Sequence, residues 1–170
     1  VATLEVDDPE QLAYVTQTTL SVDETRATIN ALKERFPSIV GPDVKDICYA
    51  TQNRQQAVRE LAQIVDMVLV VGAKNSSNSN RLAEIGKEYD TPSHLIDDAG
   101  AIDDAWFDGV ATIGLTAGAS APEALVQGVI DRISQLRGAT VVEHDGVKEN
   151  VVFKIPPELA DVASARATGD

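Results

Sequence analysis

Several features that particular protein classes need are scarce in this sequence of 170 residues. A single cysteine, Cys48, excludes an internal disulfide framework and any metal site built from several thiolates of this chain alone. Aromatic residues make up 4%, too few for platforms that stack bases or sugars. Lysine and arginine total 14 against 27 acidic residues, so this chain would repel nucleic-acid phosphates, and we expect no nucleic-acid partner.

Long apolar runs are also missing. None approaches the roughly 18 to 20 residues that span a bilayer, and no basic-then-apolar leader precedes the acidic opening VATLEVDDPE. We therefore expect no membrane partner and a cytoplasmic location. The sequence opens without methionine, and we expect it to be a piece of a longer protein.

What is present is an alternation of short apolar runs with longer segments of helical periodicity. This pattern is typical of strands and crossover helices in a parallel sheet, so we predict a three-layer α/β fold with a mainly parallel sheet. Buried strands are expected at 12–16, 38–40, 67–72, 93–96 and 110–115, and further strands at 141–144 and 150–155. Helices are expected over 22–36, from about Thr51 to Val65, from around Asn78 to Tyr89 and from Pro122 to about Leu136.

Local signals refine these elements. Ser21 and Glu24 have the spacing of a capping box at the start of the first helix, and Pro37 is expected to end that helix. The apolar face of the second helix is expected to comprise Ala57, Val58, Leu61, Ile64 and Val65. A composition shift at 41–46 predicts a domain boundary, which divides the chain into one α/β unit at 1–44, a second at 45–136 and a tail at 137–170.

Four polar loops are expected at helix starts, at 16–21, 48–53, 73–80 and 116–122. Loops that follow parallel strands emerge at one sheet edge, where ligands bind. Hydroxyls, amides and the unpaired N–H groups of helix N-termini together suit an anionic, oxygen-rich group such as a phosphate. The loops therefore predict a phosphate site that needs few basic residues.

Helix capping is the competing explanation for these polar residues. Capping alone accounts for a lone serine such as Ser21. It needs only one side chain, however, and NSSNSN at 75–80 supplies six polar side chains. We therefore expect some of Ser76, Ser77 and Asn78 to bind a ligand. Ser120 lies just before Pro122, and its position fits a cap and a ligand equally well.

Cys48 precedes the second helix, and two interpretations of it remain open. A free cysteine is commonly a small buried apolar residue, but a helix N-terminus stabilises a thiolate. Cys48 and Arg54 also match C-x5-R, the spacing of phosphatases that attack phosphate with cysteine. The intervening YATQN lacks a glycine that would let the backbone wrap a phosphate, so this match is poor.

Taken together, TQTTLSVDET, DICYATQNRQ, VVGAKNSSNSNRL and TAGASAP resemble the LytB/IspH family, the 4-hydroxy-3-methylbut-2-enyl diphosphate reductases of non-mevalonate isoprenoid biosynthesis. The resemblance runs from about Ala13 to Pro157. It implies an oxidoreductase with three α/β domains around a cavity, in which three cysteines hold a four-iron (4Fe–4S) cluster. The substrate's C4 hydroxyl would leave as water, with ferredoxin or flavodoxin as electron donor. The products would be isopentenyl and dimethylallyl diphosphate.

Matched motif by motif, the resemblance implies roles for particular residues. Cys48 corresponds to one of the three cluster ligands, while Thr18 and Gln17 correspond to residues around the substrate hydroxyl and its proton relay. The diphosphate would be bound by Ser76, Ser77, Asn78 and Ser120. The family's other two cysteines, its diphosphate-binding histidines and its proton-donating glutamate have no counterpart here.

We therefore expect this chain to correspond to the family's third domain, the trailing part of its second and its tail, and to be inactive alone. The alternatives are a non-catalytic domain that binds a phosphorylated metabolite and, third, a cysteine phosphatase.

Overall fold

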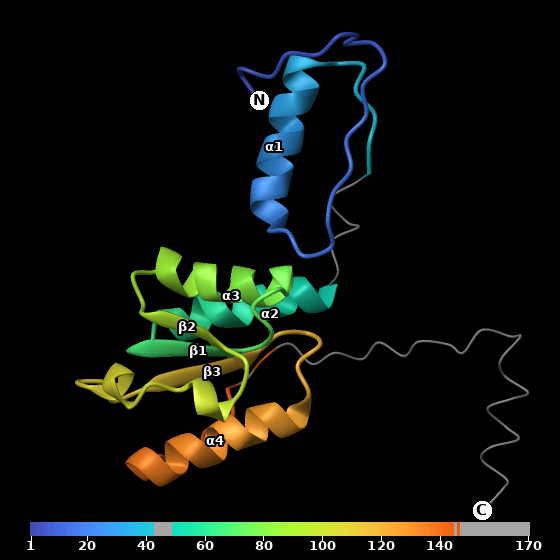
Figure 1. The fold of residues 1–170 in the computed structure, drawn as a ribbon. Coiled ribbons are helices and arrows are strands. Elements are labelled where there is room, and N and C mark those ends of the chain that lie inside the picture. Colours follow the sequence, from blue (N-terminus) through green and yellow to red (C-terminus); the bar gives the residue numbers. More distant parts are fainter. Residues whose placement is uncertain (43–48, 145, 147–170) are drawn as a thin grey trace, which may run out of the picture.

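The computed structural model describes residues 1–42, 49–144 and 146. In chain order (Figure 1) the elements are α1 (Val22–Arg35), α2 (Tyr49–Ala62), β1 (Met67–Val71), α3 (Ser77–Glu88), β2 (Ser93–Ile96), the short 3-10 helices η2 (Ala99–Ala101) and η3 (Asp104–Phe107), β3 (Ile113–Ala117) and α4 (Glu123–Arg137).

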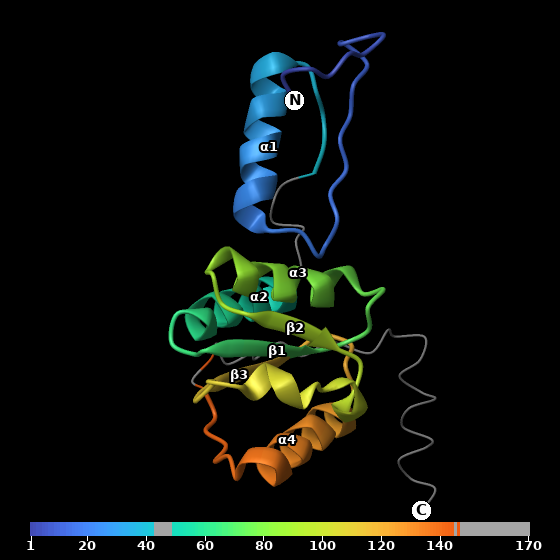
Figure 2. The same cartoon turned by 60° about the vertical axis from the view of Figure 1, so that its left-hand side comes forward.

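The three strands form one parallel sheet in the order β2-β1-β3. Helices α2 and α3 cover one face of this sheet and α4 covers the other (Figures 1 and 2). The predicted three-layer α/β fold with a parallel sheet is therefore confirmed. Because the strands are parallel, the loops that lead into α3 and α4 leave the sheet at the same edge.

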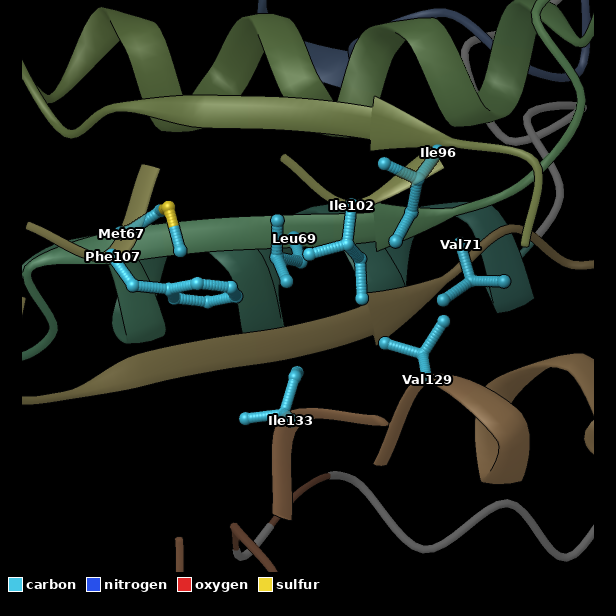
Figure 3. Close-up of a cluster of buried hydrophobic side chains, with 8 residues drawn as sticks. All are labelled: Met67, Leu69, Val71, Ile96, Ile102, Phe107, Val129 and Ile133. Atoms are coloured by element: carbon cyan, nitrogen blue, oxygen red, sulfur yellow. The ribbon is translucent and has the colours of Figure 1, made fainter. Parts of the chain in front are cut away.

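The central strand β1 explains why the core lies on both sides of the sheet. All five of its residues are buried, as expected for a strand covered by helices on both faces. Met67, Leu69 and Val71 pack toward α4, in the cluster drawn in Figure 3. Val68 and Val70 pack toward α2 and α3.

Residues 1–42 contain α1 and two extended segments that differ from the prediction. The expected strands at 12–16 and 38–40 form only one parallel bridge, between Ala13 and Val40. Val15 is 91% exposed and Val40 is 65% exposed, so these segments are not buried strands. The reason is that an apolar run becomes a stable strand only where further strands pair with it, and the described residues supply one bridge.

Other predicted boundaries also need correction. No strand forms at 141–144, where Val141 and Val142 are exposed. The strand expected at 110–115 begins at Ile113 and ends at Ala117. Helix α2 ends before Ile64, which is 64% exposed instead of lying on the helix's apolar face.

Two further predictions lie outside the described residues. These are the strand at 150–155 and most of the proposed boundary at 41–46. The division into units at 1–44, 45–136 and 137–170 stays a prediction.

The capping predictions are partly confirmed. Ser21 is the N-cap of α1, and its Oγ accepts a hydrogen bond from the backbone N–H of Glu24 at 3.5 Å. The Glu24 side chain does not complete the box, because it pairs with Arg81 of α3. Pro122 is the N-cap residue of α4, one position before the first turn in which it was expected.

Asp66 joins the beginnings of β1 and β3. Its carboxylate accepts hydrogen bonds from the backbone N–H of Thr112 at 2.8 Å, the Thr112 hydroxyl at 2.9 Å and the backbone N–H of Ala111 at 3.0 Å. These bonds, the backbone bond from Thr112 foremost, lower the pKa of Asp66. Because the pKa of Asp66 is lower in the folded than in the unfolded chain, its ionised carboxylate stabilises the fold at pH values above the ordinary aspartate pKa. This stabilisation is lost as the pH falls through the lowered pKa.

We expect D66N to have a lower free energy of unfolding than the wild type at pH 7. The difference should shrink as the pH falls below about 4, the region of the ordinary aspartate pKa. Urea unfolding across pH 2 to 7 measures it, with D108N as a control at another exposed aspartate. A difference that stays constant over this range would contradict the assignment.

Candidate functional site

The polar loop after β1 leads into the N-terminus of α3. Ser76 is the N-cap residue of this helix, and its Oγ accepts hydrogen bonds from the backbone N–H of Ser79 at 3.3 Å and the Ser79 hydroxyl at 3.1 Å. The capping interpretation therefore holds for Ser76. Because its oxygen accepts both bonds, the Ser76 hydroxyl proton is still available to a further acceptor.

Asn78 is the most unusual polar residue of this loop. It is 6% exposed, and neither Nδ2 nor Oδ1 of its side chain has a hydrogen-bond partner among the described residues. Leaving a buried polar group unpaired costs about 1–3 kcal/mol. The Nδ2–H groups of a buried amide at the positive end of a helix dipole are donors that an anionic ligand would satisfy.

Close backbone approach brings the loop before α4 to this helix start. Ser79 is 1% exposed and packs against Gly72 and Gly118. A Cβ at Gly118 would lie 2.2 Å from Ser79 Oγ and 3.6 Å from Asn78 Nδ2. The structure thus brings together two of the four predicted loops, at 73–80 and 116–122.

Two predicted ligand hydroxyls lie on the exposed side of these loops. Ser77 is the first residue of α3, and Ser120 lies in the turn before α4. Both are exposed. The N-cap Pro122 makes no side-chain cap bond, so the interpretation of Ser120 as a cap is wrong.

The third loop, at 16–21, precedes α1 and lies over the layer of α2 and α3 (Figures 1 and 2). Gln17 and Thr18 are exposed in it. The side-chain amide of Gln55 in α2 donates to the carbonyls of Thr19 at 3.3 Å and Leu20 at 3.4 Å. Side-chain-to-backbone hydrogen bonds from Gln55 therefore attach this loop to α2 directly after Thr18.

Two cations near the start of α3, Lys74 and Arg81, pair with carboxylates. Lys74 lies 3.7 Å from Asp97, and both side chains are well exposed. Arg81 is 16% exposed and pairs with Glu88 at 2.8 Å, Glu24 at 3.0 Å and Glu84 at 3.4 Å. Burial opposes the charged guanidinium, yet Glu88 and Glu24 outweigh it and raise the pKa of Arg81. An anion at this site would thus rely on N–H groups and hydroxyls.

The fourth predicted loop, at 48–53, is mostly helical, because α2 begins at Tyr49. Cys48 itself lies outside the described residues. Arg54, its partner in the C-x5-R spacing, donates to the carbonyl of Ala50 in its own helix at 3.3 Å. The described part of the chain holds no group of three or more histidine, cysteine, aspartate or glutamate side chains that could bind a metal ion. Nor does it contain a helix long and apolar enough to cross a membrane.

Sequence reasoning missed three residues that shape the site, namely Gln55, Ser79 and Arg81. Ser79 was hidden in a run of six polar residues, although its position three after the cap Ser76 is a usable signal. Gln55 and Arg81 sit in polar stretches of their helices, and no local pattern distinguishes a buried polar residue from a solvated one.

A family model described as LytB protein matches residues 1–134. The chain belongs to the LytB family. It is 60% identical over 159 residues to the 4-hydroxy-3-methylbut-2-enyl diphosphate reductase of Aeromonas salmonicida, covering 94% of this chain and 51% of that protein. It is 54% identical over 167 residues to the reductase of the same name from Zymomonas mobilis, covering 98% of this chain and 49% of that protein. The chain thus spans about half the length of the LytB relatives it matches.

Solved structures agree with this assignment to the LytB family. The E-1-hydroxy-2-methyl-but-2-enyl-4-diphosphate reductase from Plasmodium falciparum aligns with a TM-score of 0.82 at 32% identity, covering 96% of this chain and 53% of that one. A second structure, of (E)-4-hydroxy-3-methyl-but-2-enyl diphosphate reductase, gives a TM-score of 0.51 at 32% identity, covering 72% of this chain and 43% of that one. The resemblance inferred from the four loops is therefore confirmed.

Proposed function

We propose that this chain is part of an enzyme that reduces 4-hydroxy-3-methylbut-2-enyl diphosphate to isopentenyl diphosphate and dimethylallyl diphosphate. Its own contribution is to bind the diphosphate group at the start of α3. The observation that carries the proposal is the buried, unpaired amide of Asn78 beside Gly118. The names of the LytB relatives supply the substrate.

In this proposal the diphosphate oxygens accept hydrogen bonds from several donors at one sheet edge. Asn78 gives its Nδ2–H, and Ser76 gives the hydroxyl proton that its capping role leaves available. Ser77 and Ser120 approach from the exposed side. Hydrogen bonds to a charged acceptor are worth about 1.5–3 kcal/mol each, so a few donors hold an anion without a lysine or arginine.

Thr18 and Gln17 are proposed to face the other end of the substrate. Loss of the C4 hydroxyl as water replaces a C–O bond by a C–H bond, which consumes electrons and protons. The Thr18 hydroxyl both donates and accepts hydrogen bonds, so it can orient the leaving hydroxyl and pass a proton to it. Gln17 has no titratable group and would orient the substrate or Thr18.

The 4Fe–4S cluster implied by the family would supply the electrons, received from a donor such as ferredoxin or flavodoxin. This chain does not fit the whole group, since it contains one cysteine, Cys48, and the cluster takes several thiolates. We therefore assign it one ligand and no step on the cluster, and we propose that the chain alone is inactive. A cytoplasmic location also stays a prediction.

The other two functions are weaker. A domain that merely binds a phosphorylated metabolite would use the same serines and Asn78, but it would have no use for the substrate hydroxyl. A cysteine phosphatase would need Arg54 at the phosphate, whereas its guanidinium bonds to Ala50 of its own helix.

Calorimetry tests the diphosphate site, and a hydrolysis assay tests the phosphatase. We expect the chain to bind 4-hydroxy-3-methylbut-2-enyl diphosphate at least about tenfold more tightly than the corresponding monophosphate. The monophosphate lacks one phosphate group, and losing the hydrogen bonds to that charged group should weaken binding by this factor or more. Equal affinities would contradict a diphosphate site. Hydrolysis of p-nitrophenyl phosphate that C48S abolishes would favour the phosphatase instead.

A further inference from the structure

Gln55 is a buried polar residue whose contacts point to one task. Its side chain is 2% exposed, and the amide nitrogen donates to two consecutive carbonyls, those of Thr19 and Leu20. These carbonyls belong to the residues directly after Thr18. A single buried amide thus sets the path of the backbone that carries the Thr18 hydroxyl.

Arg81 makes a second connection between the same parts of the chain. It lies three positions after Asn78 in α3, and residues with this spacing are neighbours on a helix surface. Its guanidinium Nη2 pairs with Glu24 in the first turn of α1 at 3.0 Å. Helix α3, which carries Asn78, therefore also contacts α1, the helix that follows the loop containing Thr18.

The surroundings of the Gln55 contact are polar and open. A hollow of about 300 Å³ lies between α1 and α2, and its lining residues are Val22, Asp23, Gln52, Asn53, Gln55, Gln56 and Arg59. Apolar packing is thus slight here, so the position of the loop depends on directed polar contacts. An ion pair as exposed as that of Glu24 adds little to stability.

We propose that Gln55 and the Arg81–Glu24 pair are positioning residues that hold Thr18 at a fixed place relative to the diphosphate loops. This inference rests on the proposed function, because it assumes that Thr18 contacts the substrate hydroxyl. None of these three residues touches the substrate in this proposal. Their effect is to let one ligand meet Asn78 at its diphosphate end and Thr18 at its hydroxyl end.

The test compares two ligands that differ in that hydroxyl, namely 4-hydroxy-3-methylbut-2-enyl diphosphate and dimethylallyl diphosphate. The wild-type chain should prefer the first by about threefold to tenfold, the range for one hydrogen bond. In Q55E this preference should fall to that of T18V, and in E24Q it should fall part of the way, while the affinity for inorganic diphosphate stays within about twofold of wild type. A merely structural role would weaken both ligands equally.

Matched controls keep the test specific. E84Q removes a partner of Arg81 within α3 and leaves the pair with Glu24, and Q63E makes the same charge change as Q55E on an exposed glutamine. Both should keep the wild-type preference. R81K keeps the charge at Glu24 and should restore part of the preference lost in R81M.

The possible outcomes distinguish failure of the positioning role from failure of the proposed function on which it rests. If inorganic diphosphate does not bind the wild-type chain, the proposed function fails. If inorganic diphosphate binds but the wild-type chain binds 4-hydroxy-3-methylbut-2-enyl diphosphate and dimethylallyl diphosphate equally, Thr18 contacts no substrate hydroxyl. The positioning role is then overturned. An undiminished preference in E24Q, a surface variant that should fold normally, would overturn it as well.

Discussion

Gly72→Ala should lower the free energy of unfolding by about 3 kcal/mol, a large effect for one methyl group. The added Cβ would lie 2.3 Å from Ser79 Oγ and 2.8 Å from Ser79 Cβ. Rotation of the serine hydroxyl relieves only the first clash, so β1 and α3 must separate. Gly118→Ala should cost less, about 1–2 kcal/mol, because its added Cβ meets Ser79 Oγ at 2.2 Å but Ser79 Cβ at 3.4 Å.

A double-mutant cycle with Ser79→Ala distinguishes the two glycines. Without Oγ, the Gly118→Ala penalty should fall below about 1 kcal/mol, whereas the Gly72→Ala penalty should remain near 3 kcal/mol. Gly128→Ala in α4 is the control, since nothing lies within 4 Å of its added Cβ. It should stabilise by up to about 1 kcal/mol through helix propensity. Equal penalties for Gly118→Ala in both backgrounds would contradict the packing of Ser79.

Asn78→Ala should weaken diphosphate binding by tenfold or more while leaving the free energy of unfolding within about 1 kcal/mol of wild type. The binding loss follows because the variant lacks the donor proposed to meet the ligand. Stability should change little, because removing two unpaired buried polar atoms offsets the packing lost with the side chain. Calorimetric titration and urea unfolding of the same samples measure both effects.

Asn30→Ala is the matched control for this variant. Asn30 is exposed on α1 and belongs to none of the four loops, so its replacement should leave diphosphate affinity unchanged. If Asn78→Ala cost more than about 2 kcal/mol of stability and left the affinity unchanged, Asn78 would be a structural residue. The proposed diphosphate site would then lose the observation on which it depends.

The sequence predicted the sheet well where local pattern and environment agree. MVLVV at 67–71 is apolar at every position because helices cover both faces of its strand, and Ser21 caps α1 where the spacing indicated. The segments at 12–16 and 141–144 also contain short apolar runs. They fail as strands because pairing depends on neighbours that an apolar run does not reveal.

The loops that form the site could be predicted from the sequence, but which of their residues cap, are buried or are exposed could not. Parallel topology places the loops after β1 and β3 together, which the close approach of Gly118 to Asn78 and Ser79 bears out. The helix was predicted to begin around Asn78, and α3 begins at Ser77. A difference of one residue in the start decides which side chain caps the helix, which is buried and which is exposed, and a run of serines and asparagines does not encode it.

The most direct test of the diphosphate site is an NMR titration of the isotope-labelled chain with inorganic diphosphate, followed at the side-chain amide of Asn78. This signal and the backbone amides of 74–80 and 116–121 should shift first and saturate together. Sulfate at equal ionic strength should shift them much less. Shifts confined to the guanidinium groups of Arg54 and Arg81, with the Asn78 amide unmoved, would contradict a diphosphate site at the start of α3.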